Sequence, residues 1–391
     1  MRSVAVVGAA QTVHASRRAD VTLGELCLEA IVPAVADSCL QWDQIEAVVF
    51  GSGPDLLQGL RNAFLPEPTP LLGAERPILR VHTGGATGGS VFQAGVLLVA
   101  SGYARTVLLV GAEKASEPED VQAVLNTIWN PLFEQPIGLN AINMMSLQAV
   151  RQMHEHGYRL EHFGQVAVKN RRGGARNPFA QIREEVTLEQ VLGSEVIAWP
   201  IKALESCPRS DGACALVLAD AESAARARSA VWVQGIAESA DSMYIGDRLG
   251  DGVDDYIDAA TLRTAAHEAY RQAGINSPLR DLGVAEIYAP FTCNELKAYE
   301  ALGFCERGQA HRLVEAGTCD FEGELPANPS GGPMCANPIG ATGLVRVAEC
   351  AEQLRGTAAG RQVEGARRAV ATSSGGSSQF YTVCVLGSER P

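Results

Sequence analysis

The chain of 391 residues lacks several features that mark large classes of proteins. No stretch approaches the roughly 18 to 20 continuous apolar residues that a membrane-spanning helix needs. Basic residues are too few for nonspecific phosphate binding, because 32 Lys and Arg residues stand against 45 acidic ones and give a formal net charge of −13. We therefore expect neither a membrane nor a nucleic acid as a partner.

The cysteines lack the spacing and density of a disulfide scaffold or a metal site. The ten that are present form no Cys-x-x-Cys pair, and most lie inside apolar stretches. We interpret them as reduced, mainly buried thiols, which predicts a cytoplasmic protein without a metal site. The apolar run at the start is too short for a signal peptide, and we expect it to form a first strand.

What the chain does contain is an alternation of strand-like and helix-like segments, typical of an α/β fold with partly parallel sheets. In the first half, residues 3–7, 45–50, 79–82 and 106–110 predict strands, and residues 90–100 predict a buried helix. In the second half, residues 284–288, 369–372 and 380–386 predict strands, and residues 344–354 predict a helix. A glycine turn precedes the helix in each half. The whole chain of 391 residues is too long to form a single core.

Both glycine turns contain the triplet Ala-Thr-Gly, at residues 86–88 and 341–343. This shared order predicts two related halves, 1–225 and 226–391. Between about residues 113 and 208 the pattern changes, and this segment holds most of the histidines and a basic cluster. We interpret it as an insertion that covers the face beyond the carboxyl ends of the strands, where α/β proteins usually bind ligands.

The glycine turns predict an anion-binding site made of backbone N–H groups. A turn between a strand and a helix exposes such groups, and those near Gly85 and Gly376 are the candidates for an oxyanion. A dinucleotide site is a second interpretation, but the spacing is not Gly-x-Gly-x-x-Gly and no Walker motif follows. Tight packing of helix against strand is the third.

Long motifs in the chain resemble those of the thiolase superfamily, in the branch of the sterol-carrier and lipid-transfer thiolases. They are GAEKASE at 111–117, VKNRRGGARNPFAQ at 168–181, SCPRSDGACALVLA at 206–219, CNELKAYEALGFCERGQAHRLVEAG at 293–317 and NPSGGPMCANPIGATGLVRVAE at 328–349. The resemblance covers nearly the whole chain. It implies two βαβαβ halves in a five-layered α-β-α-β-α arrangement with a central loop domain, a homodimer, and CoA as part of the substrate without a covalently bound cofactor.

The sequence departs from the family at each catalytic position. Aligned on the GATG motif, Gly85 stands where relatives have the nucleophilic cysteine, and Ser373 stands where they have the second cysteine. Asn337 replaces the general-base histidine, and Tyr288 replaces the histidine of a His-Asp-x-Phe segment. Glycine has no side chain, so no acyl-enzyme can form at residue 85, and a serine hydroxyl has a far higher pKa than a thiol. Ordinary thiolase activity is therefore not expected.

The remaining backbone favours a reaction that needs an enolate but no acyl-enzyme. Retro-aldol cleavage of a 3-hydroxyacyl-CoA, with a branched or steroid-derived side chain, to a ketone or aldehyde and a shorter acyl-CoA meets this condition. The resemblance supports it, because thiolase-like aldolases of steroid side-chain breakdown also lack the cysteine. It implies a DUF35-type partner, an OB-fold zinc protein whose own cysteines bind the metal. The sequence leaves open the acyl group, the direction of reaction and whether that partner is obligatory.

Three side chains are candidates for the catalytic chemistry. Tyr288 is the first candidate for the base, if nearby N–H dipoles or a cation lower its pKa, and a buried core tyrosine is the alternative interpretation. His82 is the second, although it can also point into the sheet. Asn337 either donates a hydrogen bond to a substrate oxygen or only shapes the turn before Pro338.

Four further residues are candidates for binding the substrate. Ser373 is expected at the site, and Lys169, Arg171 and Arg172 form a cradle for the phosphates of CoA unless they are a solvated basic face. Two other functions stay open. One is an acyltransferase or thiolase with a relocated cysteine such as Cys335. The other is a non-catalytic carrier of acyl-CoA or lipid, or a scaffold subunit.

Overall fold

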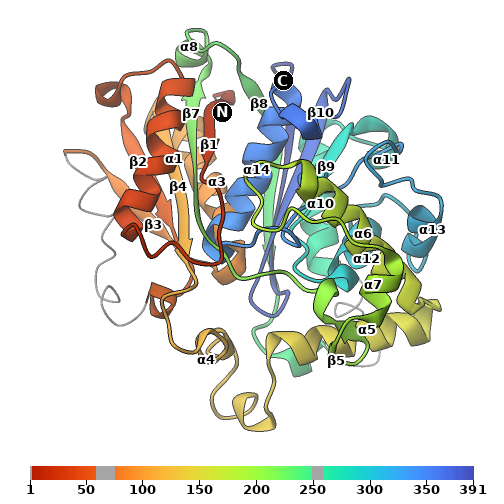
Figure 1. The fold of residues 1–391 in the computed structure, drawn as a ribbon. Helices are drawn as coiled ribbons and strands as arrows, with labels where there is room; N and C mark the ends of the chain where they lie inside the picture. Colours follow the sequence, from red (N-terminus) through yellow and green to blue (C-terminus); the bar gives the residue numbers. More distant parts are fainter. Residues whose placement is uncertain (1, 59–74, 249–258) are drawn as a thin grey trace.

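A mixed sheet runs through the whole molecule and carries helices on its faces (Figure 1). The computed structural model describes residues 2–58, 75–248 and 259–391. The strands of this sheet are β1 (Val4–Gln11), β2 (Ala47–Gly51), β3 (Ile78–Val81), β4 (Thr106–Lys114), β7 (Asp211–Asp220), β8 (Val231–Ala240), β9 (Val284–Glu286), β10 (Arg368–Gly375) and β11 (Phe380–Gly387). Within the described residues, their order is β3-β2-β4-β7-β1-β8-β11-β10-β9.

The strand order confirms the two related halves. Read outward from the centre, the first half runs β1, β7, β4, β2, β3, and the second runs β8, β11, β10, β9. In the second half, the place of β3 is taken by a single parallel bridge between Ala285 and Ala327. The outer strands β4, β2 and β3 are parallel, and so are β10 and β9, while the central strands β7, β1, β8 and β11 pair antiparallel. The predicted boundary between 225 and 226 falls in the connection from β7 to β8.

The helices form three layers around this sheet. They are α1 (Leu23–Asp37), α3 (Thr87–Ser101), α4 (Val121–Asn126), α5 (Ala141–His156), α6 (Leu160–Arg176), α7 (Leu188–Gly193), α8 (Ala221–Ala224), α10 (Ala260–Ala273), α11 (Pro278–Asp281), α12 (Thr292–Ala301), α13 (Ala310–Glu315) and α14 (Ile339–Arg355). Helices α3 and α14 lie side by side between the two halves, α1 covers the outer face of the first half, and α10 covers that of the second (Figure 1). None of the helices in the described ranges is long and apolar enough to cross a bilayer.

Alternation along the strands builds the cores between these layers. On β4, Val107 and Leu109 face the core around α3 and α14, whereas Leu108 and Val110 face the core around α1. Because successive side chains of a strand point to opposite faces, an apolar run buried on both sides is what a central strand requires. The α-β-α-β-α arrangement predicted from the resemblance is therefore confirmed.

The two central helices meet at the glycines of the shared triplets. A Cβ on Gly88 would clash with the backbone nitrogen of Leu344, and a Cβ on Gly343 would lie 2.7 Å from the backbone nitrogen of Gly89. No side chain fits between backbones this close, so both triplets need glycine. The insertion runs from the end of β4 to the start of β7 and contains α4 to α7 and the small sheet of β5 (Val196–Ala198) and β6 (Ile201–Lys202).

Candidate functional site

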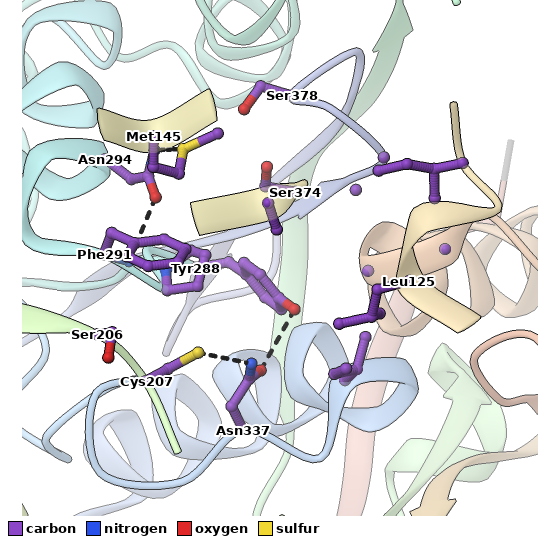
Figure 2. Close-up of a pocket in the computed structure, with 18 of the residues that line it drawn as sticks. Leu125, Met145, Ser206, Cys207, Tyr288, Phe291, Asn294, Asn337, Ser374 and Ser378 are labelled. Atoms are coloured by element: carbon purple, nitrogen blue, oxygen red, sulfur yellow. Dashed lines mark hydrogen bonds between the residues drawn. The ribbon is translucent and has the colours of Figure 1, made fainter. Parts of the chain in front are cut away.

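A cavity of about 560 Å³ lies where the loops of both halves meet the insertion. The loops after β2, β3, β9 and β10 contribute Pro54, Gly84, Gly85, Tyr288, Pro290, Ser374, Gly375 and Gly376, and the insertion contributes residues from Glu119 to Met145 and from Ser206 to Arg209. These loops follow the carboxyl ends of parallel strands, as expected for a ligand site in an α/β protein. Figure 2 shows ten of the lining side chains with labels.

The turn that contains Gly85 and the end of β10 at Gly375 touch each other at the floor of this cavity. Gly85 lies in the 3₁₀ turn Gly84–Ala86 that opens α3, and Gly375 ends β10. A Cβ on Gly85 would lie 2.7 Å from the carbonyl oxygen of Ser374 and 3.2 Å from the hydroxyl oxygen of Tyr288. The structure therefore has no room for a side chain at residue 85, and the Tyr288 hydroxyl lies beside the place where one would begin. The first N–H groups of such a turn have no partner within the helix.

Tyr288 lies at the centre of the cavity wall. Its side chain is 7% exposed, its backbone N–H donates to Thr372 Oγ1 at 3.0 Å, and its hydroxyl donates to Asn337 Oδ1 at 3.3 Å. Burial raises the pKa of Tyr288 above its ordinary value, and the nearby acidic groups of Cys207 and Glu113 raise it further. The expectation of a lowered pKa was wrong. Tyr288 is a neutral phenol near pH 7, which suits a hydrogen-bond donor.

Asn337 is held in one orientation by four hydrogen bonds. Its backbone N–H donates to Ser210 Oγ at 2.9 Å, and its Oδ1 accepts from Thr342 Oγ1 at 2.8 Å as well as from Tyr288. Its Nδ2 lies 3.1 Å from the sulfur of Cys207. The side chains of Tyr288 and Cys207 therefore both contact Asn337 (Figure 2). The residue lines the cavity as predicted. Its Nδ2 has a second hydrogen, which keeps the predicted contact with a substrate oxygen open.

Cys207 is a lining residue that the sequence did not single out. It lies at the end of the insertion, just before β7, and its backbone N–H donates to Pro290 O at 2.8 Å. Burial raises the pKa of the Cys207 thiol to about 11, while the hydrogen bond from Asn337 opposes this shift. At pH 7 only about one molecule in ten thousand then carries the thiolate, which is the nucleophilic form. Ten dispersed cysteines gave no signal for this one.

Glu113 is a second residue that the sequence did not assign. It lies in β4 and is buried, and its Oε2 accepts hydrogen bonds from the backbone N–H groups of Gly53 at 2.6 Å and Gly340 at 3.2 Å. Its other oxygen, Oε1, has no hydrogen-bond partner among the residues that the structure describes. Burial raises the pKa of Glu113 to about 7 against these bonds. The carboxyl group ties together the loops that bring Pro54 and Ile339 to the cavity wall.

Two of the predicted site residues do not line the cavity. His82 is exposed, and its Nδ1 lies 3.2 Å from the carbonyl oxygen of Ser52. Ser373 lies on the opposite face of β10 from Thr372 and Ser374, which do line it, and it is pressed against Gly89 and Gly343. The prediction that Ser373 binds substrate is corrected by this alternation of side chains along the strand.

The basic cluster on α6 also lies outside the cavity lining. Lys169 forms an ion pair with Glu295 at 2.6 Å and donates to Ala327 O at 2.5 Å, and Arg171 is buried. These two side chains serve the interior of the protein rather than a phosphate cradle. Arg172 is exposed, and its contact with CoA phosphates stays a prediction.

Comparisons with known proteins agree with this architecture. The sequence profile described as "Thiolase C-terminal domain-like" matches residues 251–388. An acetyl-CoA acetyltransferase from Methanothermobacter thermautotrophicus is 32% identical over 381 residues, which cover 96% of this chain and 97% of that protein. The chain belongs to the thiolase superfamily. Human sterol carrier protein 2 is 31% identical over 335 residues, which cover 80% of this chain and 59% of that longer protein.

Solved structures place the thiolase-like chain among enzymes of more than one kind. A structure named Ltp2-ChsH2(DUF35) aldolase has a TM-score of 0.83 and 27% identity over 98% of this chain and 97% of that one. Human mitochondrial 3-ketoacyl-CoA thiolase has a TM-score of 0.73 and 17% identity over 99% of this chain and 98% of that one, which shows the fold alone. Relatives of similar sequence thus include acyltransferases and an aldolase.

Proposed function

We propose that the chain is a carbon–carbon lyase that cleaves 3-hydroxyacyl-CoA thioesters by a retro-aldol reaction. The observation that carries the proposal is Gly85, where a side chain has no room beside Ser374 O and the Tyr288 hydroxyl. A thiolase needs a nucleophile that accepts the acyl group. A retro-aldolase needs only a hydrogen-bonded enolate and a route for one proton. The similarity to an aldolase structure supports the same assignment.

The reaction moves one proton and breaks one carbon–carbon bond. The electron pair of the O–H bond forms the new carbonyl, and the pair of the Cα–Cβ bond passes to the α-carbon and the thioester oxygen as an enolate. Backbone N–H groups at Gly85 and Gly376 hold this enolate oxygen in the proposed mechanism. One such donor is worth about 3 to 4 kcal/mol in a dry site. In the same step the α-carbon takes the proton of the Tyr288 phenol, whose oxygen receives the proton of the substrate hydroxyl, and the shorter acyl-CoA leaves.

Tyr288 carries the proton in this proposal. The substrate hydroxyl loses one proton and the α-carbon gains one. A neutral phenol can therefore accept the hydroxyl proton on its oxygen while it gives its own proton to the α-carbon. The raised pKa of Tyr288 keeps the phenol protonated. Asn337 holds the hydroxyl in place at 3.3 Å. His82 is set aside as the base because its side chain does not line the cavity.

An acyltransferase is the second candidate, and Cys207 is the observation that favours it. The earlier choice, Cys335, is buried, donates to Asn170 O at 3.4 Å and lies outside the cavity lining. Cys207 does line the cavity, although its pKa of about 11 opposes a nucleophilic role. A carrier or scaffold function would leave the chain able to bind acyl-CoA without turnover.

The proposed assembly includes a second copy of the chain and a DUF35-type partner. Among the described residues, β3 is the last strand of the sheet, and an edge strand can offer backbone hydrogen-bonding groups to another strand. The DUF35 partner rests on the aldolase structure, which is named as a complex with ChsH2. CoA enters as part of the substrate and not as a separate cofactor.

One assay separates the candidates. The chain, alone and co-expressed with a DUF35-type protein, is given 3-hydroxyacyl-CoA substrates, and products are followed by mass spectrometry. A retro-aldolase yields a ketone or aldehyde without added CoA and withstands thiol alkylation. Cleavage of 3-oxoacyl-CoA that needs CoA, stops on alkylation and is lost in C207S would establish the acyltransferase. Binding without any product from either substrate, with the partner present, would leave a carrier.

A further inference from the structure

Lys297 places a buried positive charge on the wall of the cavity, away from the proposed catalytic groups. The residue belongs to α12, a helix whose residues are all buried, and it is 2% exposed. Its ammonium nitrogen lies 3.1 Å from Gln148 Oε1. In the described part of the chain, no carboxylate lies within 4 Å of this nitrogen. The ammonium group contacts a neutral amide, and Lys297 is one of the residues that line the cavity.

An ammonium ion removed from water is unfavourable unless an opposite charge pairs with it. Three other buried cations of this protein have such a partner. Lys169 pairs with Glu295 at 2.6 Å, Arg346 with Glu286 at 2.5 Å, and Arg361 with Glu349 at 2.6 Å. A lysine without such a partner, on the wall of a binding cavity, is therefore poised to receive an anion from a ligand.

The described side chains next to Lys297 do not neutralise its positive charge. Gln148 Oε1 also accepts a hydrogen bond from Asn294 Nδ2 at 3.3 Å, and Asn294 lines the cavity beside Lys297. Glu205 is a buried carboxyl group in the same region, but it accepts from the backbone N–H of Lys202 at 2.9 Å. Burial also raises the pKa of Glu205 to about 7. The two N–H groups of the Asn294 amide already donate to Met145 Sδ at 3.0 Å and to Gln148 Oε1. The ammonium group of Lys297, in contrast, has three N–H groups and one acceptor among the described residues, so it can donate to a carboxylate.

We propose that Lys297 binds a carboxylate on the acyl group, so that the preferred substrates are CoA thioesters of dicarboxylic acids. The inference rests on the proposed function for the identity of the substrate as an acyl-CoA. Within such a thioester, the pantetheine arm is uncharged, and the charged phosphates are at the far end of the CoA. A cation buried to this degree is therefore assigned to the acyl end, while the exposed Arg209 lies on the solvent side of the same cavity.

The test measures binding and does not require turnover. Matched pairs of CoA thioesters without a 3-hydroxyl group, such as adipyl-CoA and hexanoyl-CoA, are titrated by calorimetry over acyl chains of about four to eight carbons. For the best length, we expect the carboxylated member to bind the wild-type chain about 10- to 100-fold more tightly, as for a hydrogen-bonded ion pair in a buried site. Equal binding within every pair would overturn the proposal.

The variant K297M removes the charge and keeps a side chain of similar length. It should bring the ratio of dissociation constants within each pair close to one. R209M is the matched control, because it removes a cation from the exposed part of the same cavity, and it should shift both members of a pair by the same factor. If K297M weakens both members equally, Lys297 contacts the CoA phosphates and the proposal is wrong. If K297M does not fold, the wild-type ratios alone decide.

The outcome is independent of the proposed lyase activity. A carboxylate preference that depends on Lys297, without cleavage of any 3-hydroxyacyl-CoA, would reject the lyase and keep the binding site. Cleavage with no preference for a carboxylate would reject the binding site and keep the lyase.

Discussion

The buried carboxyl group of Glu113 makes the stability of the protein depend on pH in a way that can be calculated. Its pKa rises from 4.5 to about 7 because burial disfavours the charged form. The folded protein therefore holds a proton that the unfolded chain loses between these values. By linkage, this contribution to the free energy of unfolding is complete below pH 4.5 and is lost as the pH rises to 7 and above. The difference of about 2.5 between the two pKa values corresponds to roughly 3 kcal/mol in the free energy of unfolding.

The variant E113Q removes the titration and keeps the shape of the side chain. The amide oxygen can still accept from Gly53 and Gly340, while the amide nitrogen takes the place of Oε1, which has no partner. An unsatisfied amide costs about 1 to 3 kcal/mol at every pH, so the absolute stability is not the readout. The readout is the change in free energy of unfolding between pH 5 and pH 8, from urea denaturation.

We expect this change to be smaller in E113Q than in the wild type by up to about 3 kcal/mol. The exposed Glu185 gives a control, because E185Q should leave the wild-type dependence unaltered. Other buried carboxyls, such as Glu205, contribute equally to both proteins and cancel in the comparison. The same pH dependence in E113Q and wild type would refute the assignment of a protonated carboxyl to residue 113.

The other predictions concern the cavity. Y288F should lower the cleavage rate by about 10²- to 10⁴-fold while Y270F, which alters a buried tyrosine outside the cavity, should not. Because Tyr288 is neutral, kcat/KM should not rise tenfold per pH unit above pH 8, as it would if the tyrosinate were the base. G85A should destabilise the protein by about 1 to 3 kcal/mol in urea denaturation, since its Cβ would lie 2.7 Å from Ser374 O. C207S should retain cleavage activity, measured by product formation, and a loss would favour the acyltransferase.

The arrangement of the halves could be predicted from the sequence because it depends on local patterns. Apolar runs at β4 and β10 indicated strands, and the repeated Ala-Thr-Gly triplet indicated two related halves. Tyr288 and Gly85, which follow the ends of parallel strands, both line the cavity for the same reason. The carboxyl ends of such strands meet at one edge whatever the details of packing.

The electrostatic state of the site could not be predicted in this way. The pKa of Tyr288 depends on how deeply the insertion and the α14 loop bury it, and that depth has no local signal. Ser373 was one residue out of phase with the cavity, because the register of β10 against β11 decides which side chains face it. Lys169 resembled a surface cation until Glu295, far away in the sequence, was found beside it.

The backbone contact of α3 with α14 limits which parts of this protein can accept substitutions. Two helices that touch at Gly88 and Gly343 leave no side chain that could adjust if one of them moved. The turn that opens α3 and the loop that leads into α14 are therefore fixed relative to each other, and substitutions there disturb both halves at once. New substrate preferences must arise in the walls built by the insertion and α12, which rest on that rigid floor and can vary without loosening it.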